Sequence, residues 1–473
     1  MEMMRHYLVT SIGENKGAPR VWLQGSNLDH AGFKPGTRFD IKLDDARLVL
    51  TRSDQGIRVV SRKRRGESEY PVIDINSREL LEMFEGMSAV RVVMLEEEIH
   101  ILPLATELRR QERVERTAAR MGQGDPLEIG SLSHGGGIMC HAIHAGLYRE
   151  GLDSRLVFAN EIRPELLDHA REANDCWESD TVGIAAPMQE LAFDRWAMAR
   201  LPGVDILEAG IPCSGASLSG RSKRKLGVPE DHPEVGHLAV AFLAIVAAVN
   251  PLVVVLENVP QYRDTASGAI IRSQLRDLGY AVHEVVLSGE SFNAVEDRKR
   301  YCMVAVTNGV SFSMSDLVVP ERIPVTLGDA LDEVGDDDPR WSAMPGLKAK
   351  QERDKEAGKG FMMQVFDGGS TRIGTVTKGY AKVRSTDPKI RHPRNPDLLR
   401  QLTAGEHARV KQIPERLIDG LCETTAHEVL GQSVIYGPFM AIGALIAHAL
   451  KRWAIEGPSG CQQGDAALLI ACG

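Results

Sequence analysis

The strongest constraint in this chain is a set of three apolar runs, each leading into residues that can do chemistry. The runs are residues 204–213, 252–256 and 280–287, and the chemical residues at or beyond their ends are Cys213, Glu257, Arg298 and Arg300. A short apolar run bounded by turn residues predicts a buried strand. An open α/β sheet presents its ligands at the carboxyl ends of its strands. We therefore expect a thiol, a carboxylate and two guanidiniums near one edge of one sheet.

Each of these side chains also has an ordinary structural interpretation. Most cysteines are buried packing residues, but Cys213 follows Pro212 and a basic run begins eight residues later, at Arg221. Such surroundings favour a thiolate and suggest an anionic substrate. A cysteine protease would need a histidine base, and none lies near Cys213 with an evident pairing motif. Glu257 could instead cap a helix, and the arginines could form surface ion pairs.

A glycine-rich turn precedes these runs. Residues 129–137 read as a strand followed by Gly135, Gly136 and Gly137, and the next predicted strand, 154–160, ends at Glu161. Glycines at a helix start let a cofactor approach the backbone, and an acid after the second strand is where nucleoside-binding sheets hold ribose hydroxyls. Because a phosphate-grasping Lys-Ser/Thr signature is absent, we do not expect ATP or GTP.

Composition and patterning divide the chain into segments. We expect a β-hairpin-repeat domain over 1–104, an exposed linker helix over 105–125, a catalytic α/β domain over 126–319, a smaller lobe over 320–398, a return to the catalytic domain over 399–456 and a flexible tail over 457–473. The first domain repeats at an offset of 51 residues, which aligns Phe39 with Val90 and Leu50 with Ile101. Each repeat predicts a strand, a helical turn and a two-strand hairpin.

Composition excludes several classes of protein. The 473 residues are 43% hydrophobic with a net charge of −9, and no apolar run approaches the roughly 20 residues that span a membrane. The seven cysteines are scattered without a C-x-x-C pair, so we expect neither a disulfide framework nor a metal site. We expect a cytoplasmic protein without a secretory signal.

Seven short motifs, in order, resemble the DNA (cytosine-5)-methyltransferase family over residues 126–455. The matching segments are Gly136-Gly137 with Gly146, Glu161, Gly210-Ile-Pro212-Cys213 with Ser217, Glu257-Asn258-Val259, Arg298 with Arg300, Arg400 to Pro414, and Gly431-Gln432-Ser433-Val434. The resemblance implies a Rossmann-like S-adenosylmethionine-dependent methyltransferase sheet, a target-recognition lobe at 320–398 and double-stranded DNA as substrate. A bacterial or phage setting and a restriction endonuclease partner are implied in the same way.

The resemblance also implies roles for individual residues. Cys213 would add to carbon 6 of cytosine, Glu257 would hydrogen-bond or protonate nitrogen 3, Arg298 would contact the base and help hold the glutamate, and Arg300 would support the loop. The implied cofactor-binding residues are Leu132, His134, Gly136, Gly137, Glu161, Pro212, Gln432 and Ser433. Lys223, Arg224 and Lys225 would lie in a loop that closes on DNA.

The chain departs from the family pattern near its expected pockets. Leu132 stands where Phe is usual, His134 where Gly is usual, Ser214 and Ala216 where Gln and Phe are common, Glu296 where Gln is usual, Lys411-Gln412 where Gln-Gly is usual, and Gln432 where Asn is usual. These departures keep two alternatives open: a relative that uses a modified S-adenosylmethionine, and a non-catalytic DNA-binding regulator. The motif order and the separate lobe argue against a third, an RNA cytosine-5 methyltransferase.

The N-terminal repeat carries a second resemblance. Residues 28–37 resemble the AbrB/SymE-like swapped-hairpin family. That resemblance implies binding to DNA, to a partner protein or to a second copy of the chain. A scaffold without a ligand is the alternative interpretation of this domain.

Overall fold

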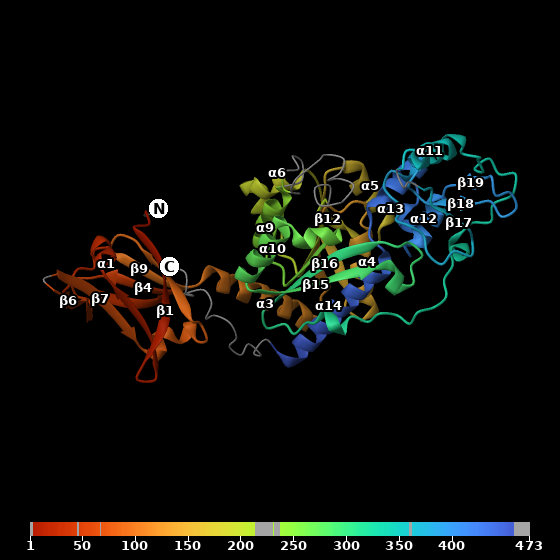
Figure 1. The fold of residues 1–473 in the computed structure, drawn as a ribbon. Coiled ribbons are helices and arrows are strands. Elements are labelled where there is room, and N and C mark those ends of the chain that lie inside the picture. Colours follow the sequence, from red (N-terminus) through yellow and green to blue (C-terminus); the bar gives the residue numbers. More distant parts are fainter. Residues whose placement is uncertain are drawn as a thin grey trace. The chain divides into compact units, whose positions relative to one another are not determined.

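The computed structural model describes residues 3–44, 47–66, 68–212, 230, 237–358 and 362–457. These residues form two compact units, with the division between Glu112 and Arg113 (Figure 1). The predicted nucleophile Cys213, the basic residues 223–225 and the predicted tail beyond Gly457 lie outside the described residues.

The N-terminal unit is built on antiparallel strands. Its elements are β1 (His6–Asn15), β2 (Ala18–Gln24), α1 (Ser26–His30), β3 (Arg38–Asp44), β4 (Arg47–Arg52), β5 (Arg58–Val59), β6 (Ser61–Arg65), β7 (Ser68–Asn76), α2 (Arg78–Leu81), η1 (Glu82–Phe84), β8 (Ala89–Met94) and β9 (Glu98–Pro103). The strand order is β5-β3-β4-β9-β8-β1-β2-β7-β6. The unit thus contains a strand, a helical turn and a hairpin twice, as β2-α1-β3-β4 and β7-α2-β8-β9.

The two repeats pair symmetrically. Leu48 lies opposite Ile101 and Leu50 opposite Ile99 in the β4–β9 ladder, and Val49 lies opposite His100. Residues 49 and 100 are themselves 51 positions apart, which is the offset of the sequence repeat. The pair Val49–His100 therefore lies on the two-fold axis that relates the two repeats. The β2–β7 ladder obeys the same symmetry. Because Leu48, Leu50, Ile99 and Ile101 are fully buried, each repeat covers the apolar face of the other.

The second unit carries a seven-stranded, mostly parallel sheet. Its first elements are β10 (Leu127–Leu132), α4 (Ile138–Arg149), β11 (Ser154–Glu161), α5 (Pro164–Ala173), β12 (Trp177–Ala185), α6 (Met188–Phe193), α7 (Arg195–Met198), β13 (Ile206–Gly210), α9 (Leu238–Val249), β14 (Val253–Asn258), η3 (Pro260–Asp264), α10 (Ala266–Asp277), β15 (Tyr280–Ser288), η4 (Gly289–Phe292) and β16 (Lys299–Thr307). The strand order is β12-β11-β10-β13-β14-β16-β15, with only β16 antiparallel to its neighbours. The predicted α/β fold class is confirmed.

The lobe and the return to the sheet complete this unit. Their elements are η5 (Met314–Asp316), η6 (Leu327–Ala330), α11 (Pro345–Glu356), β17 (Val365–Phe366), η7 (Tyr380–Lys382), β18 (Lys389–Arg391), β19 (Leu399–Arg400), α12 (Ala404–Val410), η8 (Glu415–Ile418), α13 (Glu423–Gln432) and α14 (Tyr436–Glu456). Strands β17, β18 and β19 form a small sheet that lies beside α12 in Figure 1. A separate apolar cluster, which includes Leu327, Tyr380 and Ile390, fills the lobe.

Two glycines let helix α14 return onto the sheet against α4. A Cβ on Gly146 would lie 2.1 Å from the Met440 carbonyl oxygen, and a Cβ on Gly443 would lie 2.4 Å from the Ile143 carbonyl oxygen. The backbones of the two helices therefore touch at a crossing that no larger residue fits. The expected packing of the apolar C-terminal helix on the large domain is found, with Ile442 and Ile446 fully buried.

Helix α3 (Ala105–Gln123) corrects one expectation. Its charged composition suggested an exposed linker, but Arg113 and Thr117 are buried. Arg113 donates to Thr307 Oγ1 at 2.7 Å and to the Leu278 carbonyl oxygen at 2.8 Å, while Thr117 donates to Asp205 Oδ1 at 2.6 Å. The second half of the helix therefore belongs to the catalytic unit, because its polar groups find partners there that solvent would otherwise supply.

Among the described residues, no single helix is long and apolar enough to cross a membrane. The bent pair formed by α13 and α14 passes that test of length and composition when taken together. The buried residues of α14 belong to the main apolar cluster of the catalytic unit, so this pair has an ordinary role as core helices.

The helix crossing predicts a sharp difference between two glycine substitutions. Gly146→Ala should lower the free energy of unfolding of the catalytic unit by about 1–3 kcal/mol, because its methyl group would overlap backbone atoms of α14. Gly122→Ala is the matched control: it also lies in a helix, and its added Cβ would meet no atom within 4 Å. Urea denaturation should show no loss for Gly122→Ala, and equal effects of the two variants would contradict the crossing.

Candidate functional site

The site lies at one edge of the large sheet because of strand direction. Strands β10, β11, β13 and β14 are parallel, so their carboxyl ends meet at one edge. Strand β16 runs antiparallel to β14, with Asn258 opposite Tyr301. The start of β16 therefore lies beside the end of β14, which brings residues 298–300 to the edge that carries Glu257.

The glycine-rich turn and the end of β11 are joined directly. The backbone N–H of Gly135 donates to Glu161 Oε2 at 2.9 Å, and the N–H of Arg163 donates to Glu161 Oε1 at 3.2 Å. Gly135 has a φ of 56° and no atom within 4 Å of an added Cβ. This arrangement leaves an open backbone turn beside a carboxylate, which suits a ligand that offers hydroxyl groups.

His134 points inward, beneath the glycine turn. The Trp177 indole N–H donates to His134 Nε2 at 3.3 Å, so Nδ1 carries the proton and lies 2.7 Å from Ser131 Oγ. Ser131 in turn donates to the buried carboxyl group of Glu208. Burial lowers the pKa of His134 to about 3 and raises the pKa of Glu208 to about 8. Both groups are therefore neutral at pH 7, and a chain of hydrogen bonds supports the turn from below.

His134, Cys140 and Glu208 also form one of two groups of residues that could hold a metal ion. Their potential ligand atoms lie within 4.8 Å of one another. Both ring nitrogens of His134 already have protein partners, however, and burial raises the pKa of Cys140. A hydrogen-bonded core explains this cluster without a metal.

The other predicted residues of the turn are packed tightly. Leu132 is fully buried in the apolar core. A Cβ on Gly136 would lie 2.6 Å from Val429 Cγ1 of α13, and one on Gly137 would lie 2.5 Å from Asn174 Nδ2. Glycine at these two positions lets α13 and the end of α5 approach the turn.

Asn258 fixes the backbone that leads to the predicted nucleophile. Its side-chain amide donates to the Ile211 carbonyl oxygen at 3.0 Å, and its own Oδ1 accepts from the N–H of Val259 at 2.9 Å. Pro212 follows and is exposed, and Cys213 comes next in the chain. The asparagine of the Glu-Asn-Val segment thus couples the ends of β13 and β14.

Glu257 is held by an arginine other than the one we expected. Arg300 Nε lies 2.9 Å from Glu257 Oε1. The β14–β16 register places Glu257 opposite Cys302, so Arg300 is its diagonal neighbour on the same face. Burial raises the pKa of Glu257, and the charges of Arg300, Arg298 and Lys411 oppose that rise. The balance favours a carboxyl group that can carry a proton.

Arg298 is buried and turned toward the end of α13. Its guanidinium donates to the carbonyl oxygens of Gly431 at 3.0 Å and Gln432 at 3.3 Å, and it lies 3.5 Å from Glu296 Oε1. The Gln432 side chain is exposed, and Ser433 Oγ donates to the Leu430 carbonyl oxygen at 2.7 Å. Arg298 is therefore placed to hold the last motif against the site.

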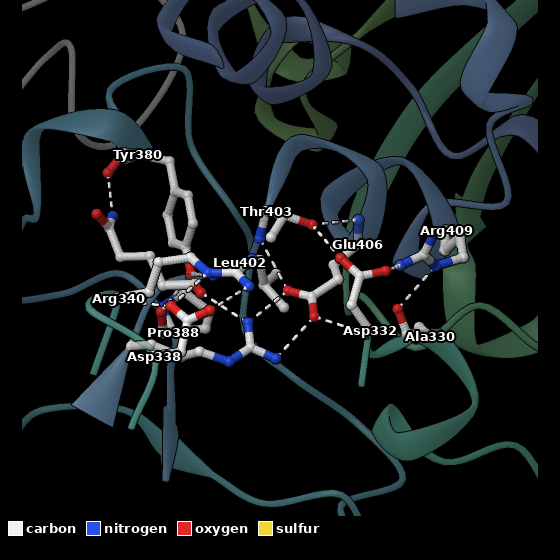
Figure 2. A network of polar contacts seen from close by, with 12 residues as sticks. Ala330, Asp332, Asp338, Arg340, Tyr380, Pro388, Leu402, Thr403, Glu406 and Arg409 are labelled. Carbon is white, nitrogen blue, oxygen red and sulfur yellow. Dashed lines mark hydrogen bonds and ion pairs between the residues drawn. The ribbon is translucent and has the colours of Figure 1, made fainter. Parts of the chain in front are cut away.

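The segment after the lobe ties the lobe back through a buried carboxylate (Figure 2). Arg400 donates to both oxygens of Glu406, at 2.6 and 2.7 Å. The same carboxylate accepts from the backbone N–H groups of Thr403 and Asp332, each at 2.8 Å. Arg409 pairs with the Asp332 side chain. Through these contacts the motif residues anchor the lobe.

The sheet order, the glycine turn with its acid at the second strand and the ionisable groups at the carboxyl edge define a class. They are the parts of an S-adenosyl-L-methionine-dependent methyltransferase, in which the turn and Glu161 fit a nucleoside with ribose hydroxyls. The comparisons with known proteins narrow this class to one family.

The sequence model of the C-5 cytosine-specific DNA methylase family matches residues 138–447. A Neisseria lactamica protein named Type II methyltransferase M.NlaX is 28% identical over 264 residues, which cover 54% of this chain and 79% of that protein. The Escherichia coli Type II methyltransferase M.Eco47II is 25% identical over 335 residues, which cover 65% and 76%. The crystal structure of S. pombe Dnmt2 methyltransferase, at 18% identity, covers 69% of this chain with a TM-score of 0.53 and supports the fold.

The chain belongs to the C-5 cytosine-specific DNA methylase family. It is a DNA (cytosine-5)-methyltransferase whose methyl donor is S-adenosyl-L-methionine.

Four residues near the site were not assigned a role from the sequence. Ser131 and Glu208 each interrupt a buried apolar strand with a polar residue, and that interruption is the signal that could have found them. Lys411 was noticed only as a departure from the family pattern, as was Glu296. Two departures of opposite charge are the signal that could have paired Glu296 with Lys411.

The buried Glu208 predicts a dependence of stability on pH. Its pKa is raised in the folded state, so its protonated form contributes stability that is present below about pH 4.5 and is lost as the pH rises through about 8. Glu208→Gln keeps an acceptor for Ser131 but cannot ionise. The melting temperature of the variant should therefore fall less than that of the wild type between pH 5 and 8.5. The exposed Glu172→Gln serves as the control and should follow the wild type; identical curves for all three would contradict a protonated Glu208.

Proposed function

We propose that Cys213 is the nucleophile and that Glu257 is its acidic partner in methyl transfer to double-stranded DNA. The observation that carries the proposal is the contact from Asn258 to the Ile211 carbonyl oxygen. It ties the backbone two residues before Cys213 to the strand end that presents Glu257. The backbone that leads to Cys213 and the carboxyl group of Glu257 therefore belong to adjacent strand ends.

The chemistry needs these groups because carbon 5 of cytosine is a poor nucleophile. Addition of the Cys213 thiolate to carbon 6 makes carbon 5 electron-rich, and Glu257 favours the addition by donating a proton to nitrogen 3. Bound S-adenosyl-L-methionine supplies an electrophilic methyl group on a sulfonium. Loss of the carbon-5 proton then expels the thiolate and frees Cys213. Because the target carbon is inaccessible inside a duplex, the base must leave the stack.

The described cysteines support this choice of nucleophile. Burial raises the pKa of Cys140, Cys176 and Cys302, which makes them poor thiolates. Cys422 is exposed, and hydrogen bonds from Thr425 lower its pKa, but it caps the start of α13, far along the chain from the Pro-Cys motif.

We assign cofactor contacts to the turn and its neighbours. Glu161 would accept hydrogen bonds from the ribose hydroxyls, with the open backbone at Gly135 beside it. The other proposed cofactor residues are Leu132, His134, Gly136, Gly137, Pro212, Gln432 and Ser433. Since Leu132 and His134 are buried, they would act by shaping the turn.

The same family membership suggests roles for the remaining parts of the chain. We propose that residues 320–398 form the target-recognition lobe, that the protein acts in the cytoplasm of a bacterial or phage-infected cell and that it pairs with a restriction endonuclease, as the Type II names of its relatives suggest. The N-terminal unit would bind a partner or a second copy. Its exposed β6 carries Arg62, Lys63 and Arg64, and Lys63 lies with Arg20 over the Trp22 ring, which gives that unit a basic face with an aromatic residue.

Replacement of the proposed nucleophile gives a direct test. Cys213→Ser should abolish transfer of a labelled methyl group to duplex DNA, because a serine hydroxyl is not ionised at neutral pH, while S-adenosyl-L-methionine binding measured by calorimetry should stay within about threefold. Cys422→Ser is the matched control and should transfer at the wild-type rate, since serine also caps a helix.

Mass spectrometry of the product nucleosides would identify 5-methylcytosine. Methyl transfer by Cys213→Ser would contradict the assignment of the nucleophile. A labelled product other than 5-methylcytosine, or transfer only from a modified donor, would favour the altered-cofactor alternative.

A further inference from the structure

Two opposite charges are buried together behind the catalytic edge. Lys411 Nζ lies 3.2 Å from Glu296 Oε2, and both side chains are 0% exposed. Removing two ions from water costs several kcal/mol each. Apolar side chains of similar volume would fill the same space without this cost. We therefore expect the two charges to have a role other than packing.

The pair lies where three segments of the catalytic unit meet. The backbone N–H of Glu296 donates to the Val410 carbonyl oxygen at 3.1 Å, which joins the loop before β16 to the end of α12. Glu296 also forms a parallel bridge with Ile373 of the lobe. Gln412, the residue after Lys411, has a φ of 62°, and its side chain donates to the Phe292 carbonyl oxygen at 2.7 Å. The backbone around the pair is thus fixed on both sides.

Both charges reach the reacting edge. Glu296 Oε1 lies 3.5 Å from Arg298, the arginine that donates to the end of α13. Burial lowers the pKa of Lys411 to about 7, and below that pH its charge lowers the pKa of Glu257 together with the charges of Arg300 and Arg298. A pair of neutral amides, the usual residues at these positions in the family pattern, could still accept a hydrogen bond from Arg298 but would leave no charge to act on Glu257.

We propose that Glu296 and Lys411 are positioning residues for methyl transfer, which hold Arg298 in place and add a positive charge to the field at Glu257. This inference rests on the proposed role of Glu257 as a proton donor.

The charges that bear on Glu257 come from several elements. The charges that lower the pKa of Glu257 belong to Arg298 and Arg300 at the start of β16 and to Lys411 after α12. Glu257 in turn raises the pKa of Glu208 on β13 and of Cys302 on β16. The pKa of Lys411 is lowered by the charges of Arg298 and Arg300 and raised by that of Glu296, and Lys411 in turn lowers the pKa of His407. Removal of the Lys411 charge therefore changes the field at Glu257 without touching its direct partner, Arg300.

A double-mutant cycle tests the positioning role. Glu296→Gln and Lys411→Gln each leave one buried charge without its partner, so each should lower kcat of the full-length enzyme by about tenfold or more, with KM for DNA and for S-adenosyl-L-methionine within about threefold. The double variant carries a neutral amide pair and should recover to within about threefold of wild type. If either single variant does not fold, the rate of the double variant still decides.

The pH profile separates positioning from stability. Since Glu257 acts as an acid, the single-turnover rate falls as pH rises above its pKa. Loss of the Lys411 charge raises that pKa, so the fall in the Lys411→Gln variant should move to higher pH by about half a unit. Glu406→Gln breaks another fully buried ion pair, with Arg400, and should leave the position of the fall unchanged.

Three results would overturn the inference. They are single variants that transfer within about twofold of wild type with an unmoved profile, a double variant as slow as the slower single variant, and a profile shift of equal size in Glu406→Gln. Failure of the wild-type enzyme to transfer methyl groups would instead contradict the proposed function.

Discussion

The antiparallel pairing of β16 with β14 is the contact on which the site depends. All other neighbouring strands from β12 to β14 are parallel and can supply the edge only with residues that follow a strand. Strand β16 runs the other way, so it supplies residues that precede a strand, and its register sets Arg300 against Glu257. A slip of one residue would turn Arg300 to the opposite face of the sheet. Glu257 would then lose its guanidinium partner.

The catalytic unit surrounds this edge with buried polar groups, each stabilised by a partner. Glu208 is protonated and accepts a hydrogen bond from Ser131, and Glu406 pairs with Arg400. Arg113 donates to the Thr307 hydroxyl of β16 and to backbone oxygens just before β15. A buried polar group is costly alone and directional when paired. These pairs therefore fix the glycine turn, the lobe and α3 in one arrangement, which apolar packing would specify less sharply.

The N-terminal unit follows a different principle. Its two repeats share no catalytic residue, and the order of the unit comes from symmetry: one offset of 51 residues relates the sequence repeat, and the same centre relates the β4–β9 ladder. A single repeat exposes one apolar face, and the second repeat covers it. The two repeats thus pair with each other within one chain, whereas a single repeat would need a second molecule to cover its apolar face.

The sequence by itself determined the strands, their order of chemical residues and the α/β class, because alternation of apolar runs with turns depends only on neighbours in the chain. It also determined which residues lie at the strand ends: Glu161, Pro212 and Glu257 at or after carboxyl ends, and the two arginines at the start of β16. Only the tertiary structure decided which arginine holds Glu257, that half of a charged helix is buried, and that Glu296 meets Lys411 across 115 positions of the chain. The physical reason is that burial and ion pairing depend on distance in space, and a charged residue reads the same in a sequence whether water or a partner surrounds it.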